Sequence, residues 1–297
     1  MVSAPGASDS ALARAYSACE QIARTHYENF PVASLLLPRR MRPAISAIYA
    51  FARRADDFAD EGALPDAERL RLLEDWRRRL HACVSGPQPV SSSDDLIFLA
   101  LGDSIRSRRL PVSLFDDLLS AFRQDVTVKR YSTWEDVLDY CSRSANPVGR
   151  LVLRVAGYDD AALDRSSDAL CTALQLTNFW QDFARDWAGG RLYIPLSDRD
   201  RAGGRDEDLD ARRITAEWRI ALRTVSSRTR RLFAEGKAVC DGVSGRLRLE
   251  LRFTWLGGTR ILDLLEQSDF DVFRRRPTLN AVDVPPLLWR AATWKAA

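Results

Sequence analysis

The sequence predicts an all-α protein whose helices surround a central cavity. Apolar residues recur with helical periodicity along most of the 297 residues, while the alternation typical of half-buried strands is nearly absent. No internal repeat or linker divides the chain, so we expect one domain over 1–297, with 1–9 flexible and 271–297 as a C-terminal tail. Two strongly apolar helical segments each carry a pair of aspartates, which a helical core tolerates only where they face a cavity.

The elements follow in order from local signals. The first amphipathic segment is closed by Pro31, and the second helix has Pro43 near its start, where its fixed backbone angle suits a helix. The stretch 85–93 is rich in Gly, Pro and Ser, and 196–210 is rich in Gly, Asp and Arg, so both should be loops. We therefore expect helices over 10–29, 42–60, 67–84, 94–108, 111–126, 133–143, 147–156, 160–187, 211–241 and 245–268.

Composition excludes several classes of function. Apolar residues make up 46% and charged residues 29%, as in soluble globular proteins, and no basic run interleaved with aromatics suggests nucleic-acid binding. Five separated cysteines predict reduced thiols in a cytoplasmic protein, and two histidines cannot build a histidine-rich metal centre. The N-terminus has no apolar signal-peptide region, and no window offers about 18 uninterrupted apolar residues, the length of a membrane span.

The most informative feature is a pair of aspartates in each of two segments, Asp56 with Asp60 and Asp182 with Asp186. A spacing of four residues places both carboxylates on one helical face, about 6 Å apart along the axis. Two such helices facing each other would surround a cavity with four carboxylates, whose charge requires cations. Oxygen ligands with almost no histidine nearby favour Mg²⁺, which commonly bridges carboxylates to a substrate phosphate. The residues themselves therefore predict a magnesium-diphosphate enzyme.

Aspartate pairs also occur on solvated helix faces, so their context decides the interpretation. The doublets 94–95, 116–117 and 159–160 have polar neighbours and are expected to be helix caps or surface residues. The two favoured pairs instead follow the apolar stretches 44–51 and 169–176. Helices this apolar are buried, so their carboxylates should line a cavity.

Three stretches, 26–38, 47–61 and 175–195, carry a family resemblance. They resemble the head-to-head prenyl synthases (squalene and phytoene synthases), and most of all the members that form hydroxysqualene in bacterial hopanoid biosynthesis. The similarity covers about residues 10–276. It implies an isoprenoid-synthase-type helical bundle, Mg²⁺ as cofactor and a prenyl diphosphate as substrate.

The resemblance implies a role for each matching residue. The Mg²⁺ ligands would be Asp56, Asp57, Asp60, Asp182 and Asp186. Diphosphate would be bound by His26, Arg53, Gln175, Asn178 and Arg191. The catalytic residues would be Tyr49, Arg53, Tyr140, Asn178 and Tyr193. The candidates for the cavity lining are Phe30, Phe51, Phe58, Phe179 and Trp180.

Each role has a plainer alternative. Tyr49 could be an ordinary core residue, and Arg53 could simply pair with a carboxylate such as Asp57. Helix packing alone would also explain the large aromatic side chains. The alternatives remain open at the level of sequence.

Departures from the family pattern bear on the reaction. Many members that join two substrates carry a basic residue just before the second aspartate pair, where this chain has Gln181. Arg185 stands where an acidic residue is usual, and Asn29 stands where other members have Ser. One cation fewer favours an enzyme that holds a single diphosphate, ionising presqualene diphosphate and capturing the cation with water. The alternatives are a transferase that joins two prenyl diphosphates to presqualene diphosphate, squalene or phytoene, and a non-catalytic lipid-binding or assembly protein.

A C₃₀ product is insoluble in water, so peripheral contact with the inner face of the cell membrane is expected. The tail, with Arg274, Arg275, Arg276, Trp289 and Trp294, could supply basic and aromatic contacts, or could pack on the helical core. An upstream presqualene diphosphate synthase could also hand its product over directly.

Overall fold

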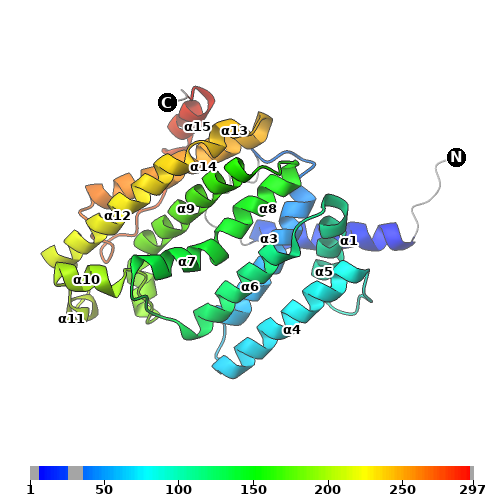
Figure 1. Cartoon of the computed structure of the whole chain (residues 1–297), viewed down its shortest axis with the longest axis horizontal. Helices are drawn as coiled ribbons and strands as arrows, with labels where there is room; N and C mark the ends of the chain where they lie inside the picture. The colour runs from blue at the N-terminus through cyan, green and yellow to red at the C-terminus, as the bar shows by residue number, and fades with distance from the viewer. Residues whose placement is uncertain (1–6, 26–35, 295–297) are drawn as a thin grey trace. The chain divides into compact units, whose positions relative to one another are not determined.

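The computed structural model of the chain describes residues 7–25 and 36–294. The predicted site residues His26 and Phe30 lie outside these ranges, as do residues 1–6 of the segment expected to be flexible. The described part is helical and contains no strand, with a single isolated bridge between Arg130 and Leu192. The prediction of an all-α fold is confirmed (Figure 1).

The helices match the predicted ranges closely, most boundaries falling within a few residues. They are α1 (Ala7–Thr25), α3 (Arg42–Asp60), α4 (Asp66–Ser85), α5 (Ser93–Arg108), α6 (Val112–Thr127), α7 (Trp134–Ser144), α8 (Asn146–Ala156), α9 (Ala161–Ala188), α10 (Leu196–Ala202), α11 (Asp206–Asp210), α12 (Ala216–Gly236), α13 (Val239–Gly242), α14 (Gly245–Gln267) and α15 (Val284–Ala292). Contacts group the chain into two compact units, residues 1–127 with 150–159 and residues 128–149 with 160–297. A single domain over 1–297 stays a prediction.

In the first unit, α3 packs against α1, α4, α5 and α6 (Figure 1). Phe51 of α3 is fully buried and stands at the centre of an aromatic cluster with Trp76, Phe98 and Phe115, at ring-centroid distances of 5.9, 6.1 and 5.5 Å. Edge-to-face and offset rings add stabilisation beyond the buried area. This cluster fixes one face of α3 and thereby sets which residues the other face presents.

In the second unit, α9 packs against α7, α12 and α14 (Figure 1). Close helix approach depends on glycine: a Cβ at Gly236 would lie 2.6 Å from the backbone N of Leu170, and one at Gly258 would lie 2.6 Å from the ring of Phe233. The buried indole N–H of Trp180 on α9 donates to Thr229 of α12 at 2.9 Å. These contacts fix the rotation of α9 about its axis.

Three segments differ from the sequence expectation. The predicted loop 196–210 contains α10 and α11, because Asp198 is 4% exposed and pairs with Arg228 of α12, which holds the segment against that helix. The predicted helix 211–241 begins at Ala216 and is interrupted after Gly236. The tail contains α15, whose Leu287 and Ala291 are buried in contact with α14. In each case tertiary burial decides the secondary structure of a segment whose own sequence is ambiguous.

Candidate active site

The first aspartate pair lies on the face of α3 opposite the aromatic cluster. Tyr49, Arg53 and Asp56 are half-buried and Asp60 is exposed, at positions i, i+4, i+7 and i+11 of one helical stripe. The intervening Phe51 and the alanines around it are buried. The helix ends directly after Asp60, where residue 61 adopts an extended backbone with ψ of 151°. The apolar run of α3 therefore presents the predicted residues together, as its periodicity indicates.

Arg53 is surrounded by carboxylates. Its guanidinium lies 2.8 Å from Asp57, 2.5 Å from Glu61 and 3.5 Å from Asp56. Burial works against the charged form, but the charges of Asp57, Asp56 and Glu61 keep the pKa of Arg53 above its usual value. The ion pair with Asp57 that the sequence left open is thus present. A guanidinium fixed this way keeps a planar donor face that suits phosphate oxygens.

The second aspartate pair lies on a matching stripe of α9. Gln175, Asn178, Asp182 and Asp186 are all half-buried and follow one another at intervals of three or four residues. Between them, Leu176, Phe179, Trp180 and Phe183 are buried. The rotation of α9 that its packing imposes therefore turns these polar groups to one side.

Asp182 is held by a residue that the sequence did not assign to the site. Arg276 donates to both carboxylate oxygens, from Nε to Oδ1 at 2.5 Å and from Nη2 to Oδ2 at 2.9 Å. Next to it, the side-chain amide of Gln181 donates to the carbonyl oxygen of Pro277 at 2.5 Å. The two contacts hold the segment 276–277 against the second aspartate motif. The only sequence signal is the arginine triplet at 274–276, and it does not say which of the three turns inward.

An aromatic cluster lies beside Asn178 and joins three predicted residues. The rings of Phe179 and Tyr193 are stacked with centroids 3.6 Å apart and planes within 2°, and Tyr140 lies 6.1 Å from each. Tyr131, which sequence reasoning did not select, lies 5.7 Å from Tyr193 and 5.6 Å from Tyr140. Such ring faces can stabilise a carbocation. Spacing could not reveal the cluster, since its members come from distant parts of the chain.

The backbone after the second motif is fixed by a parallel pairing with 129–132. The N–H of Leu192 donates to Lys129 at 2.9 Å, and the N–H of Leu196 to Tyr131 at 2.9 Å. The backbone N–H of Arg191 donates to the carbonyl of Asp186 at 2.8 Å. Tyr193 is thereby placed next to Tyr131.

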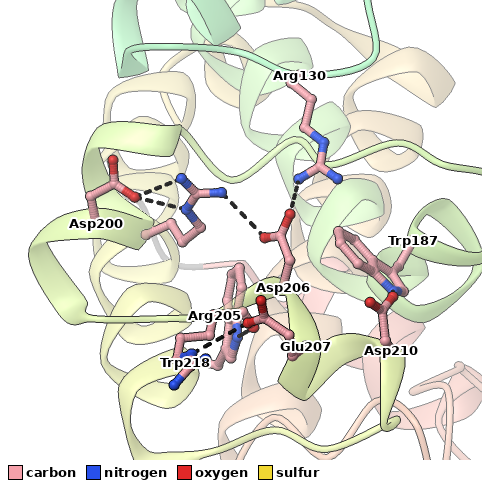
Figure 2. Close-up of polar contacts among 9 residues, drawn as sticks. Arg130, Trp187, Asp200, Arg205, Asp206, Glu207, Asp210 and Trp218 are labelled. Carbon is pink, nitrogen blue, oxygen red and sulfur yellow. Dashed lines mark hydrogen bonds and ion pairs between the residues drawn. The ribbon is translucent and has the colours of Figure 1, made fainter.

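Figure 2 shows a polar network that holds the following segment to the end of α9. Asp206 accepts from Arg130 at 3.0 Å and from Arg199 at 3.2 Å. The guanidinium of Arg130 also lies 4.8 Å from the ring of Trp187, whose indole N–H donates to Asp210 at 3.2 Å. The network ties α11 to the last turn of α9 through Trp187, and Arg199 joins α10 to α11 (Figure 2).

The predicted lining residues differ in their surroundings. Phe51 and Trp180 are both fully buried in the packing contacts described above. Phe58 is half-buried, with its ring 5.3 Å from Trp76 and under the guanidinium of Arg54 at 4.9 Å. Phe179 is stacked on Tyr193. Packing is therefore a sufficient explanation for Phe51 and Trp180, and the lining role of Phe179 stays a prediction.

The donor chemistry of both motifs fits a hard divalent cation. Each offers carboxylates one turn apart, and each already binds a guanidinium cation, Arg53 in the first motif and Arg276 in the second. The two motifs belong to different compact units. Within residues 7–25 and 36–294, no group of three or more His, Cys, Asp or Glu side chains is arranged to hold a metal ion.

A cavity of about 620 Å³ lies elsewhere in the second unit, between α7, α10 and α12. None of the sequence-predicted residues lines it. Its wall includes Arg201, Arg228 and Arg231, set against Asp198, Glu135 and Glu235.

No helix among the described residues is long and apolar enough to cross a membrane.

Known proteins resemble this chain over most of its length. The hydroxysqualene synthase of Sinorhizobium fredii is 36% identical over 244 residues, which span 82% of this chain and 80% of the relative. That of Zymomonas mobilis is 41% identical over 207 residues, 69% of this chain and 67% of the relative. The 15-cis-phytoene synthase of Synechococcus elongatus is 30% identical over 304 residues, 97% of each.

Solved structures share the fold. The squalene synthase HpnC of Alicyclobacillus acidocaldarius superposes with a TM-score of 0.81 at 38% identity, covering 87% of this chain and 95% of its own. A dehydrosqualene synthase superposes with a TM-score of 0.84 at 22% identity, covering 95% of this chain and 97% of its own. The predicted isoprenoid-synthase-type helical fold is confirmed.

The squalene/phytoene synthase family model matches residues 23–283, a range that runs through both aspartate-bearing helices. Because this match covers most of the chain and several relatives exceed 30% identity, the chain belongs to the squalene/phytoene synthase family.

Proposed function

We propose that this protein converts presqualene diphosphate and water to hydroxysqualene and diphosphate in the squalene and hopanoid pathway of the bacterial cytoplasm. The observation that carries the proposal is the identity of 36% and 41% to relatives named hydroxysqualene synthase, over 82% and 69% of this chain. The stripes on α3 and α9 support it, because each presents carboxylates and an amide or guanidinium group on one helical face.

Each aspartate motif would bind diphosphate oxygens through Mg²⁺. The ligands would be Asp56, Asp57, Asp60, Asp182 and Asp186. When bound, Mg²⁺ neutralises the charge of the departing diphosphate. Arg53 and Arg191 would donate to its oxygens, with Gln175, Asn178 and His26 as further donors. Binding the diphosphate would require Arg53 to exchange part of its contact with Asp57 for the substrate.

The reaction breaks one C–O bond, and its electron pair leaves with the diphosphate. The resulting cyclopropylcarbinyl cation opens to the squalene skeleton, and the oxygen of water forms the new C–O bond, with loss of one water proton. The stacked rings of Phe179 and Tyr193, with Tyr140 beside them, would stabilise the cation through their faces and limit access of water. In the first unit, Tyr49, Phe58 and Phe30 would be further lining residues, whereas Phe51 and Trp180 are fully buried in helix packing.

A second function has an observation in its favour. Joining two prenyl diphosphates needs more positive charge, and Gln181 removes a cation from the position where two-substrate members carry one. Arg276, however, brings a guanidinium to Asp182, so the second motif does not lack a cation. A head-to-head prenyltransferase that makes presqualene diphosphate or phytoene is therefore the alternative.

We also propose that the substrate reaches this enzyme from an upstream presqualene diphosphate synthase.

The test is product analysis by mass spectrometry on the purified full chain with Mg²⁺ and no reductant. Presqualene diphosphate should give hydroxysqualene, and farnesyl diphosphate should give no product. Presqualene diphosphate or phytoene formed from prenyl diphosphates would overturn the lyase proposal in favour of the transferase. No product from either substrate would place the chain in the non-catalytic class.

Matched variants locate the site. Asp56→Asn and Asp182→Asn should each lower kcat/KM at least a hundredfold, because each removes a carboxylate from the proposed metal site. Asp75→Asn is the control, since that aspartate lies on α4, outside both motifs, and pairs with Arg78 at 2.6 Å. Equal activity of the three variants would contradict the assignment of the two motifs.

A further inference from the structure

The C-terminal helix α15 presents an apolar stripe to solvent. Val282 is 81% exposed and Trp289 is 71% exposed, and the exposed Pro285 and Pro286 lie between them. These residues occupy positions i, i+3, i+4 and i+7, which is one face of a helix and the turn before it. Single exposed apolar residues are ordinary, but a contiguous row that includes a tryptophan marks an interaction surface.

The stripe is held rigidly, because the opposite face of α15 is anchored. Leu287 and Ala291 are buried, and Asp283 pairs with Arg260 of α14 at 3.3 Å. Beyond the helix, Trp294 packs edge-to-face on Trp255 at 5.3 Å. Trp289 is therefore left outside by the packing of α15, and its exposure does not come from a loose chain end.

Trp294 and Trp289, which the sequence could not tell apart, have different surroundings in the structure. Its indole N–H donates to Asp241 at 3.4 Å, and Lys237 and Arg252 lie over its ring at 5.2 and 5.4 Å. Its partners are thus all within the second unit. Arg276 is likewise turned inward, onto Asp182. Of the tail residues expected to contact a membrane, Trp294 and Arg276 have partners within the second unit, whereas Trp289 is exposed.

The charges that accompany the stripe are basic. Arg290 follows Trp289 directly, is exposed and makes no ion pair with the part of the chain that the structure describes. Arg275 is exposed as well, and Arg274 is exposed but pairs with Asp271 at 3.5 Å. Asp283, the acidic residue of 272–294, is 14% exposed and paired. An apolar row with exposed arginines complements an anionic bilayer, where tryptophan occupies the interface and arginine meets the headgroups.

We propose that the exposed face of α15, formed by Val282, Pro285, Pro286, Trp289 and Arg290, is a docking surface for an anionic lipid bilayer. This inference rests in part on the proposed function, since a prenyl lipid substrate resides in a membrane. Vesicle binding is measured without substrate, so a failure of the docking proposal is distinguishable from a failure of the proposed function.

The experiment is co-sedimentation of the full chain with vesicles of phosphatidylcholine alone, or of equal amounts of phosphatidylcholine and phosphatidylglycerol. The protein should partition onto the anionic vesicles. Trp289→Ala should lower the partition coefficient about tenfold or more, since it removes a large inserted ring. Arg290→Gln should lower it about fivefold on anionic vesicles and leave binding to phosphatidylcholine unchanged.

Two matched variants control for exposure. Ile220→Ser removes another exposed apolar side chain, 53% accessible and located on α12, and Arg231→Gln removes an exposed arginine of the same helix. Neither should change vesicle binding. Unchanged binding of Trp289→Ala would overturn the proposal. So would a loss of self-association in that variant by light scattering, because it would make the stripe a contact between copies of this chain.

Discussion

Glu250 should make the stability of this protein depend on pH in a direction opposite to that of most carboxylates. It lies on the buried face of α14, 7% exposed, with Leu247 and Phe253 on the same face. Its Oε2 atom has no hydrogen-bond partner among the described residues. Burial raises the pKa of this carboxyl group from 4.5 to about 8.

The magnitude follows from the two pKa values. Between pH 4.5 and about pH 8, the folded protein binds one proton more than the unfolded chain. The free energy of unfolding therefore falls by about 1.4 kcal/mol for each pH unit of increase in this range. The stabilising contribution is therefore complete below about pH 4.5 and is lost progressively up to about pH 8. At about pH 7 the accumulated loss is about 3 kcal/mol.

Glu250→Gln removes the titration with little change of volume. Relative to the parent chain, the variant should gain about 3 kcal/mol at about pH 7, or about 6 °C in melting temperature, and almost nothing at about pH 4.5. Thermal unfolding followed by circular dichroism across this range measures the difference. Glu235→Gln, an exposed glutamate of α12, is the control and should show no such trend. A difference between parent and Glu250→Gln that stays constant with pH would refute the reasoning.

Two further predictions concern packing and the network of Figure 2. Gly258→Ala should lower the free energy of unfolding by about 1–3 kcal/mol, because its Cβ would lie 2.6 Å from Phe233 and 2.7 Å from Leu174. Gly86→Ala is the control, because a Cβ there meets nothing within 4 Å; equal melting temperatures of the two variants would contradict the close approach at Gly258. Asp206→Asn should speed limited proteolysis within 196–215, because it weakens the pairs with Arg130 and Arg199; Glu207→Gln, whose side chain is 73% exposed, should leave the cleavage rate unchanged.

Features encoded by neighbouring residues were predictable. Ser92 and Asp95 form a reciprocal capping box at the start of α5, and the side chain of Asp160 caps α9, accepting from the N–H groups of residues 162 and 163. Their interpretation as caps is confirmed. The aspartate stripes of α3 and α9 follow from the same local rule, since a spacing of four residues fixes a shared face whatever the helix packs against. The roles of these stripe residues stay predictions.

Features that join distant residues were not predictable. Asp182 and Arg276 are 94 positions apart, and nothing in the triplet 274–276 says which arginine faces the second motif. The buried Asp198 makes helices of a segment whose composition indicates a loop.

The sequence by itself determined most of the long helices and the two polar stripes, because helical periodicity and capping act over a few residues. Tertiary structure alone decided that Arg276 binds Asp182, that Tyr131 joins the aromatic cluster and that Trp289 faces solvent while Trp294 packs inward. Each of these outcomes depends on how helices rotate and dock to bury apolar surface. Packing of this kind is shared among many distant residues, so no local pattern records it.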